Sequence, residues 1–510
     1  MERKIAEMLD EYLARPLSPW HMPGHKRKTF FGDMWDEMFR HDLTEVPGTD
    51  DYHHPEGAIL ASERAAAEVY GTACSHYLVG GSTAGILAGV LALTELFRGE
   101  YGEDARPVFL VGKNVHRSVH NALRLAGAER IDLLPEGDED YGPVLAEEVR
   151  RKLGAPPVSG EGIDGNPHGL WEFAGCVITS PTYGGAISPI REIHEILSER
   201  GIPLMVDEAH GAHLPFIKEM APLSGIGSGA EIVVQSLHKT LPALTQTAVI
   251  HLTGQRRDKG KNGKKGDWYD TERLERSLKE KLAVVQSSSP SYILMASAEQ
   301  AVAWADENRD AFEGYLCRIK EFRASLMESM ACFRLAEYQP FQDPTRITLV
   351  FKNELSGVSM VQAAQWLEER YGIVAELAGE RELILISTIA DTEEDLRRLK
   401  QALETEELPC TVPDIPITGP GKQETVPDIP ITGPGKQETV PDIPITGPGK
   451  QETVPDIPIT GSGGIAEEDI YVYPPGILIV HKGEIITAEA EARILREMKA
   501  GRKVHGLIKD

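Results

Sequence analysis

Two side chains that could act on a small molecule each come at the end of a strongly apolar segment. Lys239 lies in IVVQSLHKTLPAL, and Asp207 follows PLMV in PLMVDEAHGAH. Partial burial would lower the pKa of such an amine and make it nucleophilic toward a carbonyl. The Asp207 carboxylate would reach the crevice at the carboxyl ends of the strands, where α/β proteins bind ligands. Each has a simpler explanation when taken alone: a surface lysine, and an aspartate that caps a helix.

A third feature is the glycine-containing turn LVGGSTAGIL at residues 78–87. Gly80 and Gly81 allow the backbone to approach a ligand closely, and the amides of Ser82, Thr83 and Ala84 would lie at a helix N-terminus, which favours phosphate. The turn matches neither GxGxxG nor a P-loop, and capping would explain both hydroxyl groups equally well. The turn indicates a phosphate site only when it is considered together with Lys239 and Asp207.

The combination meets the needs of pyridoxal phosphate. This coenzyme requires a lysine for its aldehyde, a carboxylate beside its ring nitrogen and an anion site for its phosphate. Lys239, Asp207 and the 80–84 loop supply one each. His116, in KNVHRSVHNAL, follows the apolar run 108–112 and could lie over the ring. Its position fits a surface histidine at a helix start as well.

The segments that would position these residues alternate between short apolar runs and helix-like stretches. Five runs are nearly continuous in apolar and β-branched residues: 108–112, 176–180, 203–209, 232–237 and 248–252. Strands buried on both faces have this composition, and the alternation predicts an α/β fold with a mostly parallel sheet covered by helices. Residues 293–408 resume the pattern, with runs at 346–352 and 382–387, which predicts a second, smaller α/β domain.

We therefore expect five parts along the chain. They are an N-terminal helix and loop segment (1–50), a large coenzyme-binding domain (51–292), a small α/β domain (293–408), a proline-rich linker (409–464) and a C-terminal module (465–510). In the first part, apolar residues at helical spacing predict a docking helix over residues 4–13.

The linker contains an internal repeat. TVPDIPITGPGKQE begins at 411 and recurs at 425 and 439, and an altered copy starts at 453. Each 14-residue unit has three prolines, so neither a continuous helix nor an inner strand can pass through it. An extended linker is the simpler interpretation, and a docking array for a partner is the alternative.

Composition excludes several classes. The 510 residues include 41% hydrophobic ones, enough for a sizeable core, and the net charge of −26 disfavours nucleic acid as a partner. A basic stretch at 254–268 is most simply a solvated surface loop. No run reaches the roughly 18 apolar residues of a membrane span, so we expect a cytoplasmic protein without membrane contact. The five cysteines are scattered and lack CxxC spacing, which predicts neither disulfides nor a metal site.

Several longer motifs carry a family resemblance. HMPGHK, DDYHHPEGAI, the GGST loop, KNVHRSVHNAL, SPTYGG, VDEAHGAH, QSLHKTLPALTQ, QSSSPSY and the terminal YPPG resemble signatures of the bacterial Orn/Lys/Arg decarboxylase family, and in particular its Gram-positive arginine decarboxylase-like members. The similarity covers most of residues 20–300 and returns at 468–484. It implies a fold-type-I pyridoxal-phosphate enzyme that acts as a homodimer or higher oligomer. The proline-rich copies depart from the pattern and put the usual place of the terminal module beside the active site in doubt.

The resemblance also assigns roles to particular residues. It implies Lys239 as the Schiff-base lysine, Asp207 at the pyridine nitrogen and His116 stacked on the ring. Further residues would hold the phosphate or line the ring: Ser82, Thr83, Ser236 and His238 for the phosphate, and Ala209 and His210 for the other face and the edge. Catalysis would then fall to Lys239, Asp207, His116 and His210.

The expected reaction is α-decarboxylation of arginine, lysine or ornithine to an amine that feeds polyamine metabolism, with arginine slightly favoured by analogy. A carboxylate must read the distal cation, and candidates are Asp50, Asp51, Glu56 and Glu468. An aminotransferase or another lyase would share the lysine and the aspartate, and Arg346 could grip a substrate carboxylate as aminotransferases require. An inert scaffold that binds partners through its repeats is the alternative from a different class.

Overall fold

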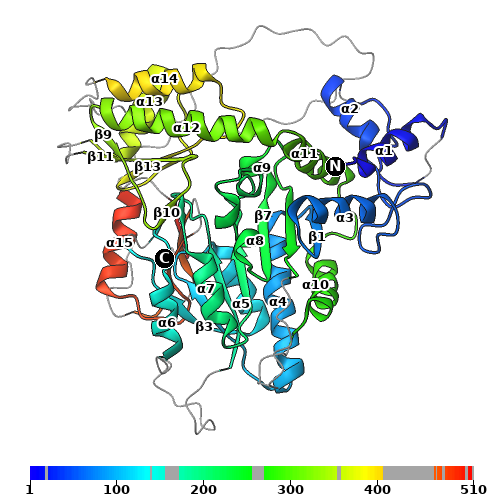
Figure 1. Ribbon diagram of the computed structural model, residues 1–510, viewed down its shortest axis with the longest axis horizontal. Helices are drawn as coiled ribbons and strands as arrows, with labels where there is room; N and C mark the ends of the chain where they lie inside the picture. Colours follow the sequence, from blue (N-terminus) through cyan, green and yellow to red (C-terminus); the bar gives the residue numbers. More distant parts are fainter. Residues whose placement is uncertain are drawn as a thin grey trace, which may run out of the picture.

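The computed structural model describes residues 1–17, 21–30, 32–137, 140–154, 172–254, 269–352, 358–405, 464–466, 468–473, 477–499 and 503–507. A seven-stranded sheet with the order β1-β8-β7-β6-β4-β2-β3 lies at the centre (Figure 1). Its strands are β1 (Cys74–Leu78), β2 (Val108–Gly112), β3 (Glu129–Leu133), β4 (Phe173–Thr179), β6 (Leu204–Asp207), β7 (Ile232–Ser236) and β8 (Ala248–Leu252). Strand β8 runs in the direction opposite to all the other strands of this sheet.

Both faces of this sheet are buried. Along β2, Val108 and Leu110 belong to one apolar cluster, while Phe109 and Val111 belong to another, as side-chain alternation requires. The second cluster includes residues of α4, α5 and α10, and the first continues through α6 and α7 into α11 and α12. The helices are α1 (Lys4–Ala14), α2 (Asp33–His41), α3 (Ala58–Tyr70), α4 (Gly81–Tyr101), α5 (Arg117–Ala126), α6 (Ala146–Gly154), α7 (Ile190–Ser198), α8 (Gly225–Ser228), α9 (Leu237–Thr240), α10 (Thr271–Val285), α11 (Tyr292–Glu307) and α12 (Arg309–Ser329), with short 3-10 turns at Leu214–Phe216 and Ala221–Leu223.

A four-stranded antiparallel sheet follows with the order β12-β13-β11-β9. Its elements are β9 (Phe333–Leu335), β11 (Arg346–Phe351), β12 (Leu377–Ala378), β13 (Glu382–Ile386), α13 (Met360–Tyr371) and α14 (Glu393–Glu404). A two-stranded pairing of β5 (Ala186–Ile187) with β10 (Phe341–Gln342) joins it to the region of the large sheet.

The C-terminal part forms a three-stranded sheet with one helix. Its elements are β14 (Ile470–Tyr473), β15 (Ile477–Val480), β16 (Lys503–His505) and α15 (Ala488–Lys499). Val472 and Ile477 pack with Tyr141, Leu377 and Ile384, so this module contacts both the large-sheet region and the small sheet. Figure 1 shows α15 close to the small sheet. The module thus lies beside the cavity described below, despite the repeats that precede it.

The predicted α/β class and the mostly parallel sheet are confirmed, and the expected strands are present with small changes in their ends. The elements without an expected counterpart include α2 and β3. The proline-rich repeats and nearly all of the basic stretch 254–268 lie outside the described residues, and the division into five parts stays a prediction. Among the described residues, no helix combines the length and the apolar character needed to cross a bilayer.

Candidate active site

A cavity of about 620 Å³ lies where the central parallel strands end. Thr179, Asp207 and Ser236 are the last residues of β4, β6 and β7, and all three line it. Its described lining consists of Gly81, Ser82, Thr83, Asn114, His116, Asp140, Thr179, Tyr183, Asp207, Ala209, His210, Ser236, His238, Lys239, Glu376, Ile386 and Ile477. The strand ends of the large sheet, the small sheet and β15 therefore share one cavity. This is the crevice in which α/β folds bind ligands.

The predicted anion loop occupies the N-terminus of α4. The helix N-cap is Gly80, and neither Ser82 nor Thr83 caps it, so both hydroxyl groups are available to the cavity. Gly81 has a φ of +71°, which explains why glycine stands there. Ala84 is buried with its methyl group outside the cavity lining, so it would contribute its backbone amide alone.

Hydrogen bonds with Gln286 and Gln246 hold the anion loop in position. Gln286 Oε1 accepts hydrogen bonds from the N–H groups of Val79 and Gly80, at 3.0 and 3.3 Å. The side chain of Gln246 donates to the Val79 carbonyl at 2.7 Å, and its backbone carbonyl accepts from Gly81 N–H. The loop is thus fixed by partners far away in the sequence.

Asp207 is 3% exposed, and its Oδ1 accepts the Ala209 N–H at 3.2 Å. Burial raises the pKa of Asp207, and the nearby positive charge of Lys239 opposes that shift. A basic side chain therefore shares the cavity with the carboxylate, which the apolar strand before it could not supply.

The amine of Lys239 belongs to a chain of three side chains. Its Nζ lies 3.1 Å from His210 Nε2, and His210 Nδ1 lies 2.9 Å from Arg346 Nη2. Burial lowers the pKa of Lys239 and is joined by the charge of Arg346, whereas Asp207 acts in the opposite direction. Burial also holds the pKa of His210 well below its usual range, together with the charges of Lys239 and Arg346. The expected activation of the lysine by partial burial agrees with this geometry.

His116 and His238 also line the cavity. His116 caps α5, where its Nδ1 accepts from Ser118 N–H at 3.2 Å. Burial, assisted by the charges of Lys239 and Arg117, lowers the pKa of His116 to about 4. The ring is therefore uncharged at neutral pH. His238 Nδ1 lies 2.9 Å from the Thr247 carbonyl.

Some lining residues escaped prediction. Tyr183 stands in the quoted SPTYGG motif, which was a usable signal, but Asp140 and Glu376 lie in segments without any motif. Glu376 Oε1 accepts the Tyr183 hydroxyl at 2.5 Å. The four carboxylates expected to read a distal cation, Asp50, Asp51, Glu56 and Glu468, are absent from the described lining. Asp50 instead binds backbone N–H groups at the start of α3.

The central sheet with its one antiparallel strand, the strand-end lysine and aspartate and the anion loop at α4 define a fold-type-I pyridoxal-phosphate enzyme. A sequence model described as "Orn/Lys/Arg decarboxylase, major domain" matches residues 5–341. The chain belongs to the Orn/Lys/Arg decarboxylase family.

The relatives agree with this assignment, and a solved structure agrees with the fold. The chain is 30% identical over its full length to an uncharacterized protein YaaO of Bacillus subtilis, with 97% of that protein covered. It is 27% identical to an arginine decarboxylase of Halalkalibacterium halodurans, with 96% of this chain and 91% of the relative covered. The fold resembles the lysine decarboxylase LdcF of Francisella novicida with a TM-score of 0.68 at 18% identity, covering 99% of this chain and 79% of that one.

The coenzyme of this family is pyridoxal phosphate, and the cavity fits it. Ser236 Oγ and Thr179 Oγ1 are buried without a hydrogen-bond partner among the described atoms, although both residues line the cavity. A buried hydroxyl group without a partner is costly, and a bound ligand with acceptor oxygens removes that cost. Together with the uncommitted Ser82 and Thr83 side chains, these atoms offer donors to a polar, anionic group.

Proposed function

We propose that this chain removes the α-carboxylate of a basic amino acid as CO2 and releases the corresponding amine, with arginine slightly favoured over lysine and ornithine. The observation that carries the proposal is the meeting of Lys239, Asp207 and the anion loop in one cavity that also contains Asp140 and Glu376. The family supports a basic substrate, and arginine decarboxylases among the relatives support the preference.

Pyridoxal phosphate, when bound, supplies a covalent attachment for the substrate nitrogen and a ring that takes up the electron pair left by CO2. Lys239 would hold the coenzyme covalently, Asp207 would keep its ring nitrogen protonated, and His116 with Ala209 would flank the ring. The donors for its phosphate would be Ser82, Thr83, Ser236 and His238 together with the amide of Ala84.

The reaction also requires the delivery of one proton to Cα. The bond between Cα and the carboxylate breaks, its electron pair stays with the organic part, and one proton from solvent then bonds to Cα. Lys239 Nζ and His210 Nε2, 3.1 Å apart, are the pair that we assign to this delivery. His210 would thereby have a catalytic role beside its contact with the ring edge.

The cationic end of the substrate would lie near the carboxylates of Glu376 and Asp140. Glu376 is exposed to solvent at the cavity, and its carboxylate already accepts the Tyr183 hydroxyl. Asp140 forms an ion pair with Arg493 of α15. Because no cation among the described residues forms an ion pair with Glu376, whereas Asp140 is paired with Arg493, Glu376 is the stronger candidate to bind a guanidinium or ammonium group.

We further propose that the chain works as a homodimer in polyamine metabolism. Large apolar side chains are exposed together in residues 22–38: Met22, Phe30, Met34, Trp35 and Met38, at 40% to 65% exposure. Helix α2 contributes no buried residue in the single chain. Apolar groups gathered in this way are typical of a protein contact surface. A second copy of the chain is the partner that the family implies.

The test is a substrate screen on the purified protein loaded with pyridoxal phosphate. Arginine, lysine and ornithine are each supplied, and CO2, amine and keto acid are measured. We expect CO2 and amine in equal amounts from at least one of them, and a loss of more than about 10³-fold in Lys239→Ala. Keto acid without CO2 would identify an aminotransferase and reject the proposal. Arg346, the residue that such an enzyme would need, is 0% exposed and outside the cavity lining.

A further inference from the structure

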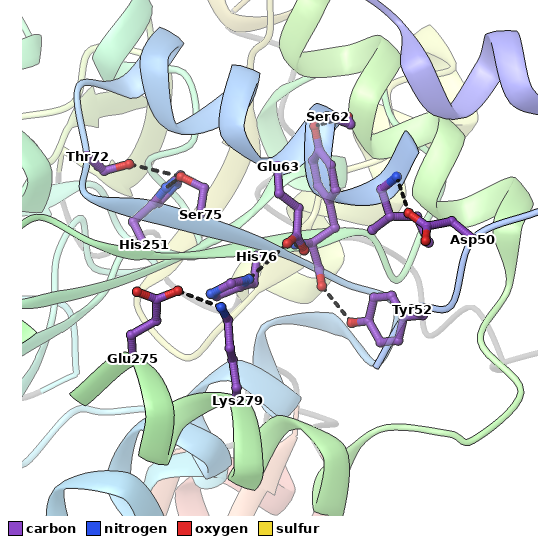
Figure 2. Close-up of polar contacts among 12 residues, drawn as sticks. Asp50, Tyr52, Ser62, Glu63, Thr72, Ser75, His76, His251, Glu275 and Lys279 are labelled. Atoms are coloured by element: carbon purple, nitrogen blue, oxygen red, sulfur yellow. Dashed lines mark hydrogen bonds and ion pairs between the residues drawn. The ribbon is translucent and has the colours of Figure 1, made fainter. Parts of the chain in front are cut away.

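A second cluster of reactive side chains lies outside the coenzyme cavity, at the β1 edge of the large sheet. Cys74 and His76 are two residues apart on β1 and therefore project from the same face of the strand. Glu275 extends from α10 toward His76 (Figure 2), and α10 packs on that side of the sheet. One ligand atom from each residue, namely a sulfur, an imidazole nitrogen and a carboxylate oxygen, lies within 4.8 Å of the others.

The histidine of this cluster is already oriented. His76 is 8% exposed, and its Nδ1 lies 3.0 Å from Glu63 Oε2. Glu63 is fixed in turn, because its other oxygen accepts the Tyr77 N–H at 3.2 Å. The remaining ring nitrogen, Nε2, is buried without an oxygen or nitrogen partner among the described atoms, and Cys74 is the side chain that interacts with the ring from within the cluster. A carboxylate that binds one imidazole nitrogen while the other stays available is the usual support of a metal-binding histidine.

We propose that Cys74, His76 and Glu275 bind a zinc ion. A set of one sulfur, one nitrogen and one oxygen ligand suits this ion, whereas magnesium and calcium prefer oxygen alone. Three protein ligands leave the fourth tetrahedral position for water or a small anion. The site is independent of the proposed decarboxylase function, because none of the three residues lines the coenzyme cavity.

Lys279 and a proton on His76 compete with the zinc ion, and the ion can displace both. Lys279 donates to Glu275 Oε1 at 2.6 Å, but both side chains are partly exposed and the second carboxylate oxygen remains for the metal. The Glu63 carboxylate raises the pKa of His76 to about 10 against the effect of burial, so zinc has to displace a proton from Nε2. It displaces another from the Cys74 thiol, and both protons pass to solvent.

The position of the cluster gives the ion a structural consequence. β1 ends at Leu78, and the next residues form the anion loop of the coenzyme cavity. Helix α10 ends at Val285, and the next residue is Gln286, whose side chain holds that loop. Zinc would therefore link β1, which precedes the anion loop, to α10, which precedes Gln286. Glu275 follows His76 by about 200 positions, so spacing along the chain does not indicate a metal site.

The test is metal binding by the full chain loaded with pyridoxal phosphate. After treatment with a chelator and its removal, we expect one zinc per chain on reconstitution, measured by elemental mass spectrometry. Titration with Co²⁺ should produce a thiolate-to-cobalt charge-transfer band. Cys74→Ser should abolish the band and Glu275→Gln should weaken binding. Glu63→Gln should lower the affinity by about 10–100-fold.

Two matched variants control for nonspecific binding. Cys317→Ser removes an exposed cysteine of α12, and Glu272→Gln removes an exposed carboxylate from α10. Both should bind zinc as the wild type does. The proposal is overturned if the wild type takes up no stoichiometric metal or shows no charge-transfer band, results that do not depend on how any variant folds. It is also overturned if the Cys74→Ser chain, shown to be folded by circular dichroism, binds Co²⁺ with the wild-type affinity and spectrum.

Discussion

Arg346 donates a hydrogen bond from Nη2 to Nδ1 of His210 across 2.9 Å. A guanidinium group has donors only, so Nδ1 must accept, and the uncharged imidazole then carries its hydrogen on Nε2. That nitrogen lies 3.1 Å from Lys239 Nζ. The hydrogen bond between them requires a lone pair on Nζ, so the contact favours the neutral amine, which is the form that attacks a carbonyl.

The first prediction concerns the charge of Arg346. In Arg346→Gln the pKa of Lys239 should rise, because the guanidinium lowers it in the wild type. A smaller fraction of the amine is then neutral at a given pH below that pKa. The pH range over which the rate of coenzyme attachment rises should therefore move to higher pH. In addition, kcat/KM should fall about 10-fold or more. The rate at which the coenzyme-free chain takes up pyridoxal phosphate, followed over a pH series, measures this.

Arg334→Gln is the matched control, since it removes an exposed arginine from the neighbouring strand β9. Its pH profile should coincide with that of the wild type. If Arg346→Gln lowers the rate equally at every pH, Arg346 supports the fold alone and the argument from the tautomer fails.

The second prediction separates function from stability at Asp207. Asp207→Asn removes the charge proposed to face the ring nitrogen, and kcat should fall by about 10²–10⁴-fold. Burial raises the pKa of this carboxyl, so its charge is costly in the coenzyme-free chain. The free energy of unfolding without coenzyme should therefore stay the same or increase, as measured by urea denaturation. A variant that loses stability together with activity would show that Asp207 is a structural residue.

The sequence predicted the parts of the site that depend on strand ends. Lys239 and Asp207 come directly after apolar runs, and parallel strands deliver such residues to one edge of the sheet. The contacts that were not predicted have no such signal. Arg346 and His210 are 136 positions apart, and their contact exists only because the small sheet packs against the large one. Glu376 enters the cavity for the same reason.

The elements that escaped prediction have a physical reason as well. Strand β3 forms the edge of the large sheet and contains Glu129, Arg130 and Asp132, so it lacks the continuous apolar character of a strand buried on both faces. Helix α2 buries none of its residues in the single chain. The homodimer proposed above would bury its apolar residues against a second copy of the chain.

The third prediction concerns Glu208, the neighbour of Asp207. It is fully buried, its two oxygens accept from Gly225 N–H and the Gln235 side chain, and burial raises its pKa from 4.5 to about 8. Between these two values the folded chain holds a proton that the unfolded chain has released. The stability that this group contributes is therefore complete below pH 4.5 and is lost as the pH rises toward 8, by about 1.4 kcal/mol per pH unit.

Glu208→Gln should remove that slope. The difference in unfolding free energy between the variant and the wild type should shift in favour of the variant as the pH rises from about 5 to 8. Gln235 Oε1 has no partner among the described atoms, so a turned amide can accept from the new glutamine. Glu192→Gln, on the exposed face of α7, should show no such trend. Urea unfolding at several pH values measures both, and parallel curves for wild type and Glu208→Gln would contradict the assignment.

The fourth prediction concerns the side chain that reads the distal charge of the substrate. Glu376→Gln keeps the size and the acceptor for Tyr183 but removes the negative charge, so kcat/KM for a basic amino acid should fall about 10–100-fold, mainly through KM. Asp140→Asn should have a smaller effect, because Asp140 is already paired with Arg493. Slow turnover of norleucine, whose side chain is uncharged, should be unaffected by either change. Equal losses for charged and uncharged substrates would mean that Glu376 shapes the cavity without reading the cation.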